Sequence, residues 1–117
     1  DLPVNFGLFY FAQCYSGGFA EKMGYGKNIG MSNSNKNEPS YGDRFLGAYF
    51  TYDLFPDVMQ QRETIGGAFD KAVKKDTNLF QRLICKYPAE TPQLMWQDAD
   101  PYVLFLGGKF KYKPNMI

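Results

Sequence analysis

The residue with the clearest chemical potential in this sequence is Cys14. It follows an apolar run over residues 6–12 and precedes a turn that contains Gly17 and Gly18. A thiol held at the exposed end of a strand can attack a carbonyl carbon when backbone N–H groups face the resulting oxyanion. Gly17 and Gly18 would leave that space open. The segment therefore predicts a thiol nucleophile, set against the commoner case in which a free cysteine is a small buried apolar residue.

The sequence contains no histidine, and this limits what Cys14 can do on its own. A self-contained Ser-His-Asp or Cys-His catalytic set is excluded, and so is any zinc site that requires imidazole. No residue pattern indicates a cofactor or a metal site. A general base for Cys14 must therefore come from another segment or from another chain.

Length and composition indicate one globular domain over residues 1–117. With 13 Lys and Arg residues against 12 Asp and Glu the net charge is +1, so we expect no nucleic-acid partner. The longest apolar runs, over residues 8–12 and 102–106, are too short to span a membrane. The sequence starts at Asp1 without a signal-peptide pattern, from which we expect a processed or truncated product of a longer polypeptide.

Apolar runs that are too short for helices alternate with segments of helical periodicity. We expect strands over residues 6–12, 28–32, 94–96 and 102–106, and helices over 19–23, 44–54, 79–84 and from residue 64 onward. The first strand is apolar throughout and is expected to be buried on both faces. The pattern predicts an α/β sandwich with a mainly parallel sheet. Its crevice would lie at the carboxyl ends of the strands, where Cys14 and the loop over residues 33–43 would meet.

Four segments, taken in order, resemble the legumain family of the caspase-like cysteine peptidases. Residues 9–18 (FYFAQCYSGG) resemble the strand that carries the nucleophile in that group. Residues 30–41 (GMSNSNKNEPSY) are similar to the strand and Asn-x-x-Glu-x-Ser-Tyr loop of legumains, and residues 46–52 (LGAYFTY) to the helix start that follows. Residues 91–94 (TPQL) resemble the segment before the last strand. The matches extend over most of residues 5–106 and imply a three-layer α/β/α sandwich, of which this chain is an incomplete or partner-completed half.

The resemblance implies two roles for Cys14. Its thiolate would attack a peptide carbonyl and form a thioester, and its own backbone N–H would be one oxyanion donor. The general base of the family, a His followed by Gly on the preceding strand, has no counterpart in this chain. We expect that base on a segment upstream of residue 1 or on a separate partner chain. The implied function is that of a cysteine endopeptidase portion, inactive alone, whose substrates are peptides or proteins.

The substrate pocket implied by the resemblance departs from that of legumains. Ala12 and Ala48 stand at the positions of its two acidic residues, so asparaginyl specificity does not transfer. Ser40 is the one wall residue that carries over. Acidic residues that could serve the pocket from other positions are Glu38, Asp43 and Asp53.

Other interpretations of the same residues stay open. A caspase-like homologue without catalytic activity, acting as a structural or interaction subunit, would explain the missing histidine and the replaced pocket residues. A transamidase would form the same thioester and resolve it with an amine. Cys85 is interpreted as a packing residue, although a disulfide between Cys14 and Cys85 would silence the nucleophile. Alternating Lys and aromatic residues over 109–113 favour an edge strand over a contact for single-stranded nucleic acid.

Overall fold

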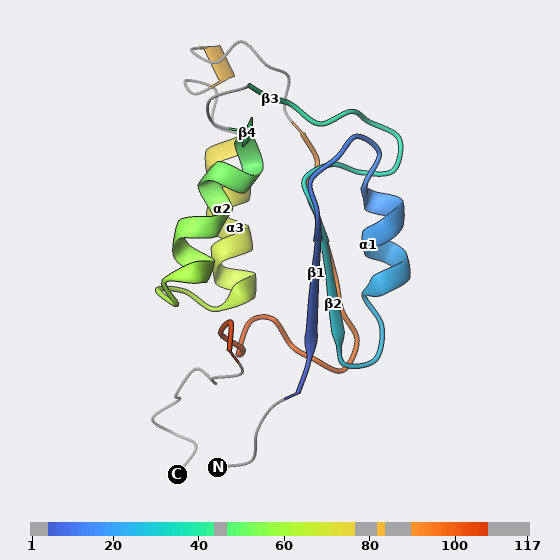
Figure 1. The fold of residues 1–117 in the computed structure, drawn as a ribbon, viewed down its shortest axis with the longest axis vertical. Coiled ribbons are helices and arrows are strands. Elements are labelled where there is room, and N and C mark those ends of the chain that lie inside the picture. Colours follow the sequence, from blue (N-terminus) through green and yellow to red (C-terminus); the bar gives the residue numbers. More distant parts are fainter. Residues whose placement is uncertain (1–4, 44–46, 77–81, 84–89, 108–117) are drawn as a thin grey trace.

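The computed structural model of the chain describes residues 5–43, 47–76, 82–83 and 90–107. Three strands form its main sheet in the order β1-β2-β5 (Figure 1). β1 (Gly7–Phe11) runs parallel to β2 (Asn28–Ser32), and β5 (Gln93–Met95) runs antiparallel to β2. The described chain is a small α/β domain, as expected. Its sheet is mixed, which corrects the expectation of a mainly parallel sheet.

The helices explain why the last strand is reversed. α1 (Gly17–Met23) carries the chain back between β1 and β2, so that these two strands point the same way. α2 (Tyr49–Met59) and α3 (Ile65–Asp76) then form an antiparallel pair that begins and ends near the carboxyl end of β2 (Figure 1). After these two helices the chain has returned to the end of the sheet at which β2 finishes. The next strand, β5, must therefore run in the opposite direction.

One helix begins later than its sequence pattern predicts. The apolar spacing over residues 44–54 predicts a helix there, whereas α2 begins only at Tyr49. The two residues before it form β4 (Gly47–Ala48), which pairs with β3 (Gly42–Asp43) in a short hairpin. The other two helices are confirmed: α1 starts two residues before the expected range of 19–23, and α3 follows the pattern from residue 64.

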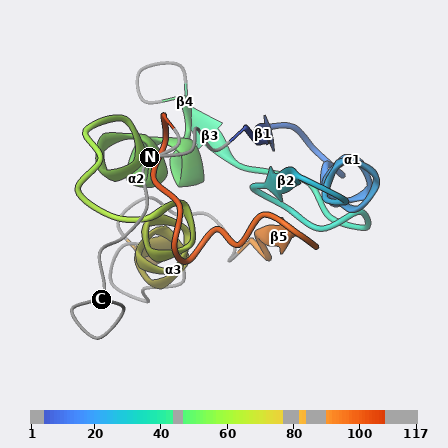
Figure 2. The same ribbon diagram turned by 90° about the horizontal axis from the view of Figure 1, so that it is seen from below.

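The helices cover both faces of the sheet (Figure 2). α2 and α3 lie on one face and α1 lies on the other. Gly30 permits the close approach of α1, because a Cβ atom at this position would lie 2.2 Å from the carbonyl oxygen of Ala20. The principal core lies between the sheet and the α2/α3 pair. Its buried side chains are Ile29, Met31, Phe50, Leu54, Val58, Ile65, Ala68, Phe69, Ala72, Ala99 and Leu104.

β1 is an edge strand of the described sheet and is less buried than its sequence predicts. The expectation of burial on both faces is wrong, since all five residues keep some exposure and Phe9 is 36% exposed. Alternate backbone groups of β1 face β2, starting with the Gly7 N–H, which donates to the Lys27 carbonyl at 3.0 Å. The N–H and C=O groups of Leu8 and Tyr10 therefore point away from β2. No described strand pairs with them.

The expectation of a strand over residues 102–106 is also wrong. These residues form a turn and an isolated bridge. The segment serves the start of α3 instead: its Leu104 carbonyl accepts the Ile65 N–H at 2.9 Å, and the carbonyl of Pro101, directly before it, accepts the Gly66 N–H at 2.7 Å. The first N–H groups of a helix have no partner within it, and these two carbonyls supply one. An apolar run of strand length thus contributes a carbonyl to the start of a helix.

Three expectations fall on residues outside the described ranges. Cys85 and the tail over residues 109–113 lie wholly outside them, and of the helix expected over 79–84 only residues 82–83 are described. Among the helices that are described, none is long and apolar enough to cross a membrane.

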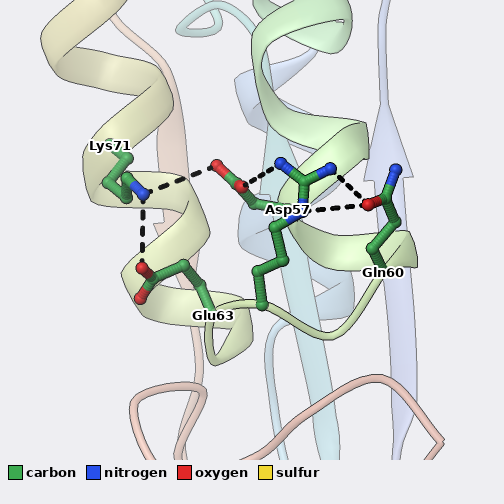
Figure 3. A network of polar contacts seen from close by, with 5 residues as sticks. Asp57, Gln60, Glu63 and Lys71 are labelled. Carbon is green, nitrogen blue, oxygen red and sulfur yellow. Dashed lines mark hydrogen bonds and ion pairs between the residues drawn. The ribbon is translucent and has the colours of Figure 1, made fainter.

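A network of ion pairs joins the end of α2 to α3 (Figure 3). The Asp57 carboxylate lies 3.8 Å from Arg62 Nη1 and 3.9 Å from Lys71 Nζ. Lys71 Nζ also lies 3.3 Å from Glu63 Oε1, and the Arg62 guanidinium donates to the Gln60 side chain. Asp57 is buried, whereas both cations and Glu63 are open to water. The carboxylate at position 57 is therefore the member that depends most on its partners.

We predict that Asp57→Asn lowers the free energy of unfolding by about 1 kcal/mol, because the buried charge that attracts both cations is lost while the cations stay hydrated. Glu63→Gln removes only an exposed contact of the same Lys71, and its effect should stay below about 0.5 kcal/mol. Urea denaturation of both variants and the wild type measures the difference. Equal losses in the two variants would contradict the role assigned to Asp57.

Candidate active site

The carboxyl ends of β1 and β2 lie at one edge of the sheet, because the two strands are parallel (Figure 1). Cys14 follows the end of β1, and the loop over residues 33–41 follows the end of β2. The β3–β4 hairpin and the start of α2 lie at this edge as well (Figure 1). The structure thus brings together the two segments that the sequence predicts to meet there.

Cys14 is a free and exposed cysteine whose sulfur contacts Ser40. The Ser40 N–H donates to Cys14 Sγ at 3.5 Å, and the Ser40 hydroxyl lies within donating distance at 3.9 Å. The thiol in turn reaches the Ser40 carbonyl oxygen at 4.0 Å. The sulfur can therefore act as an acceptor toward two donors of one residue. Two of the predicted site residues are in direct contact.

Tyr15, the residue after Cys14, has a left-handed backbone conformation. Its φ of 61° is unusual for a residue with a bulky side chain, and that side chain is 55% exposed. The Tyr15 N–H donates to the Glu38 carbonyl oxygen at 2.9 Å. Strain of this kind persists only where neighbouring contacts maintain it. The loop that contacts the Cys14 sulfur therefore also holds the backbone beside it.

A buried polar network supports the Cys14 turn. Ser16, Asn33 and Ser34 have no exposed surface. The Ser34 hydroxyl donates to the Gln13 carbonyl at 3.1 Å and lies 3.2 Å from the Ser16 hydroxyl. The Ser16 hydroxyl donates to Asn33 Oδ1 at 3.1 Å and makes no cap hydrogen bond to α1. These bonds attach the turn between β1 and α1 to the residues that follow β2.

The expected role of Gly17, to leave space for an oxyanion, is wrong. Gly17 is buried, and a Cβ atom there would lie 2.7 Å from the Lys36 backbone nitrogen and 2.8 Å from Asn35 Cα. The loop backbone already fills that space. Gly18 is more open, with its nearest neighbour, Lys36 Cβ, at 3.7 Å. The absence of a side chain at Gly17 thus serves the packing of the loop against α1.

The two alanines of the predicted pocket lie at the same edge as Cys14. Ala12 directly follows β1 and is exposed. Ala48 ends β4, is half-buried and pairs with Gly42, two residues after Ser40. The hairpin therefore places Ala48 near the Ser40 side of the site, and β1 brings Ala12 from the other side. Neither residue contributes a charge.

The acidic residues considered for the pocket are placed differently. Glu38 Oε1 accepts the N–H groups of Asn35, at 3.0 Å, and of Thr91, and Glu38 Oε2 accepts the Thr91 hydroxyl at 3.3 Å. This carboxylate therefore clamps the loop to the segment before β5. Asp53 is a buried residue of α2, and the side chain of Asp43 lies outside the described part of the chain.

Glu90 is a buried acid that the sequence analysis missed. It is 3% exposed, and its Oε2 accepts the N–H of Tyr41, the neighbour of Ser40, at 2.9 Å. Loss of hydration, and next the charge of Asp76, raise the pKa of Glu90 from 4.5 to about 8, against the opposing effect of the Tyr41 N–H. A single Glu in a proline-rich segment carries no sequence signal for burial. Only the tertiary fold reveals its position behind the site.

Comparisons with known proteins find no match to this chain among family models, curated proteins or solved structures. The resemblance to legumains therefore rests on the residues of the chain alone. Within the described ranges, no group of three or more His, Cys, Asp or Glu residues is placed to hold a metal ion.

We predict that Ser34→Ala lowers the free energy of unfolding by about 1–3 kcal/mol, because it removes the partner of the buried Ser16 N–H, which donates to the Ser34 hydroxyl at 3.4 Å, and of the half-buried Gln13 carbonyl. Ser40→Ala is the matched control: it removes a hydroxyl 3.9 Å from the Cys14 sulfur and should change stability by less than about 0.5 kcal/mol. Urea denaturation and amide hydrogen exchange at residues 13–16 measure both effects. An unchanged stability of Ser34→Ala would contradict the supporting role of the network.

Proposed function

We propose that this chain is the nucleophile-bearing part of a caspase-like, legumain-related cysteine endopeptidase. The observation that carries the proposal is the placement of Cys14, which is free and exposed at the carboxyl end of a parallel strand with the Ser40 N–H directed at its sulfur. A cysteine that serves only packing is usually buried among apolar side chains. The exposure of Cys14 therefore favours a chemical role.

In the proposed reaction, an imidazole supplied by a partner takes the thiol proton, and Cys14 Sγ attacks the carbonyl carbon of a peptide bond. The Cys14 N–H and a donor from the partner stabilise the oxyanion. The C–N bond breaks, and the amine leaves with the proton of the imidazolium. Water then attacks the thioester, which releases the carboxylic acid and restores the thiol. Because the chain has no histidine, it should show no turnover alone.

The partner would complete the sheet at the free edge of β1 and so produce the three-layer α/β/α sandwich. Leu8 and Tyr10 turn backbone groups toward this edge and also line a cleft of about 180 Å³ beside α2. The cleft lining is apolar, with Phe55 and Met59 contributed by α2. A strand added parallel to β1 would cover the cleft, and its carboxyl end would lie close to Cys14. A histidine at that end would be the general base.

The pocket beside Cys14 would accept a side chain other than Asn. Ala12, Ala48 and Ser40 supply no charge at the positions carried over from the family, and the Glu38 carboxylate is occupied by the chain itself. A wider and less polar pocket is therefore the specificity that these residues support.

The second candidate is a structural or interaction subunit that has lost catalysis. The observations in its favour are the absence of histidine from the sequence and the replacement of both pocket acids by alanine. A subunit of this kind would use the open edge of β1 for assembly only. The two candidates share the partner and differ in whether that partner brings a base to Cys14.

We predict that a biotinylated peptidyl acyloxymethyl ketone labels Cys14 in the protein purified from its natural source with its bound polypeptides. The sulfur displaces the carboxylate of the probe, and a thioether forms. Labelling should be at least about 100-fold faster than in the isolated chain, which lacks the base. Peptide mapping identifies the modified cysteine. Cys14→Ala should abolish labelling, and Cys85→Ser should leave it unchanged.

If iodoacetamide alkylates Cys14 but the peptidyl probe does not, the chain is a non-catalytic subunit. Labelling confined to Cys85 would also contradict the peptidase proposal. Mass spectrometry of the co-purified polypeptide gives its sequence and shows whether a His-Gly pair follows an apolar run of strand length. Addition of an amino acid ester separates hydrolysis from transamidation by the partition of the thioester: the amide is the main product of a transamidase, and the carboxylic acid is the main product of a hydrolase.

A further inference from the structure

Hydrogen bonds lead from a pair of buried acids to the Cys14 sulfur. Asp76, the last residue of α3, is 0% exposed, and Glu90, which precedes β5, is 3% exposed. Glu90 Oε2 accepts the Tyr41 N–H at 2.9 Å. The residue before Tyr41 is Ser40, whose N–H and hydroxyl are directed at Cys14 Sγ. The acid pair therefore lies behind the residue that touches the proposed nucleophile.

A proton shared with Asp76 would satisfy a buried oxygen of Glu90. Glu90 Oε1 is buried and has no hydrogen-bond donor among the described groups. Asp76 is close enough to form a hydrogen bond with the Glu90 side chain, yet two ionised carboxylates are acceptors only. A proton shared between them supplies the donor and removes the repulsion between two buried like charges.

We propose that Glu90 is a positioning residue: protonated and paired with Asp76, it holds Tyr41 and Ser40 against Cys14, and loss of the proton separates Glu90 from Asp76 and draws Tyr41 and Ser40 away from Cys14. The structure thereby assigns a pH-dependent position to the donors of Ser40 that contact the Cys14 thiol. The inference rests on the proposed function only for the catalytic meaning of Cys14. The pH-dependent movement itself concerns only the geometry around Cys14.

The groups that face Glu90 set the pH at which it loses its proton. Burial contributes most, and the charges of Asp76 from α3 and Glu38 from the loop add to it. The Tyr41 N–H opposes them by favouring the carboxylate, and the pKa of Glu90 settles at about 8. Tyr10 of β1 faces the same acids: burial and then their charges raise its pKa, against the hydrogen bond with Thr51. Glu90 thus keeps its proton at neutral pH.

Once Glu90 ionises, one of the two acids must move. Asp76 ends a helix whose preceding turns pack in the principal core, where Ala72 is fully buried. Residues 90–92, before β5, have no regular structure, and Glu90 is joined through Tyr41 to the exposed site around Cys14. Segments with fewer packed contacts open at lower free energy. Glu90 therefore moves and draws Tyr41 and Ser40 away from Cys14.

A proton–nitrogen NMR titration of the ¹⁵N-labelled chain tests the proposal. The Tyr41 amide cross-peak should move with a midpoint near pH 8 in the wild type. Glu90→Gln keeps an acceptor for Tyr41 and a donor for Asp76, so its cross-peak should stay in place over the same range. Asp76→Asn removes one charge and should lower the midpoint. The control Glu63→Gln, before the opposite end of α3, should titrate as the wild type does.

The reactivity of Cys14 gives a second readout. Iodoacetamide alkylation is followed by peptide mapping, and the wild-type rate is divided by the Glu90→Gln rate at each pH. The ionisation of the thiol itself cancels in this ratio. The ratio should be near one at pH 6 and rise at least about threefold by pH 9.5, as Ser40 releases the sulfur.

The free energy of unfolding should also depend on the protonation of Glu90. Between pH 4.5 and about 8 the unfolded chain has lost the Glu90 proton while the folded chain retains it. The free energy of unfolding, relative to Glu90→Gln, should therefore be highest below pH 4.5, fall as the pH rises to about 8, and then level off.

A Tyr41 cross-peak that does not titrate near pH 8, or that titrates equally in Glu90→Gln, would overturn the proposal. A flat ratio of alkylation rates would do the same. These measurements use the chain alone, with no peptide probe and no histidine. Their failure is therefore distinguishable from failure of the peptidase function, which the labelling of Cys14 decides.

Discussion

The parallel pairing of β1 with β2 is the constraint on which the candidate site depends. The register of this pair, which sets Phe11 opposite Ser32, makes both strands end at one edge of the sheet. The chain leaves the sheet twice at that edge, and its buried polar groups need partners there. The segments that follow the two strands supply these partners to each other. The Ser34 hydroxyl donates to the Gln13 carbonyl, and the Glu38 carbonyl accepts the Tyr15 N–H. The Cys14 turn is therefore held by the segment after β2.

The antiparallel β5 follows from the same geometry and completes the site. Because α2 and α3 return the chain to the edge from which it departed, the segment before β5 also starts there (Figure 1). Thr91 donates to the Glu38 carboxylate, and Glu90 accepts from Tyr41. Residues about fifty positions apart in sequence thus support one loop. A parallel last strand would have required this segment to start at the opposite edge, away from Cys14.

The sequence predicts the elements whose own residues decide their structure. Apolar runs indicate β1 and β2, and the helical spacing of apolar residues predicts α3, because periodicity reports which side chains are buried. The contact between Cys14 and Ser40 follows from these elements and the general rule for strand ends. Contacts between residues that are far apart in the sequence could not be predicted from it. The run over residues 102–106 has the composition of a strand, but its Leu104 carbonyl accepts the Ile65 N–H at the start of α3. Glu90 is buried only because the fold encloses it.

The proposed function must account for two deficits of the described chain, and one element can meet both. The sequence offers Cys14 no imidazole, and the sheet offers β1 no neighbour on its outer side among the described strands. These deficits lie close together, since Cys14 follows β1, the strand whose outer side has no neighbour among the described strands. A parallel strand paired with β1 would satisfy the backbone of Leu8 and Tyr10, and its carboxyl end would come beside Cys14. A partner that binds for structural reasons would thus also be placed to deliver a base, which makes assembly and activation a single event.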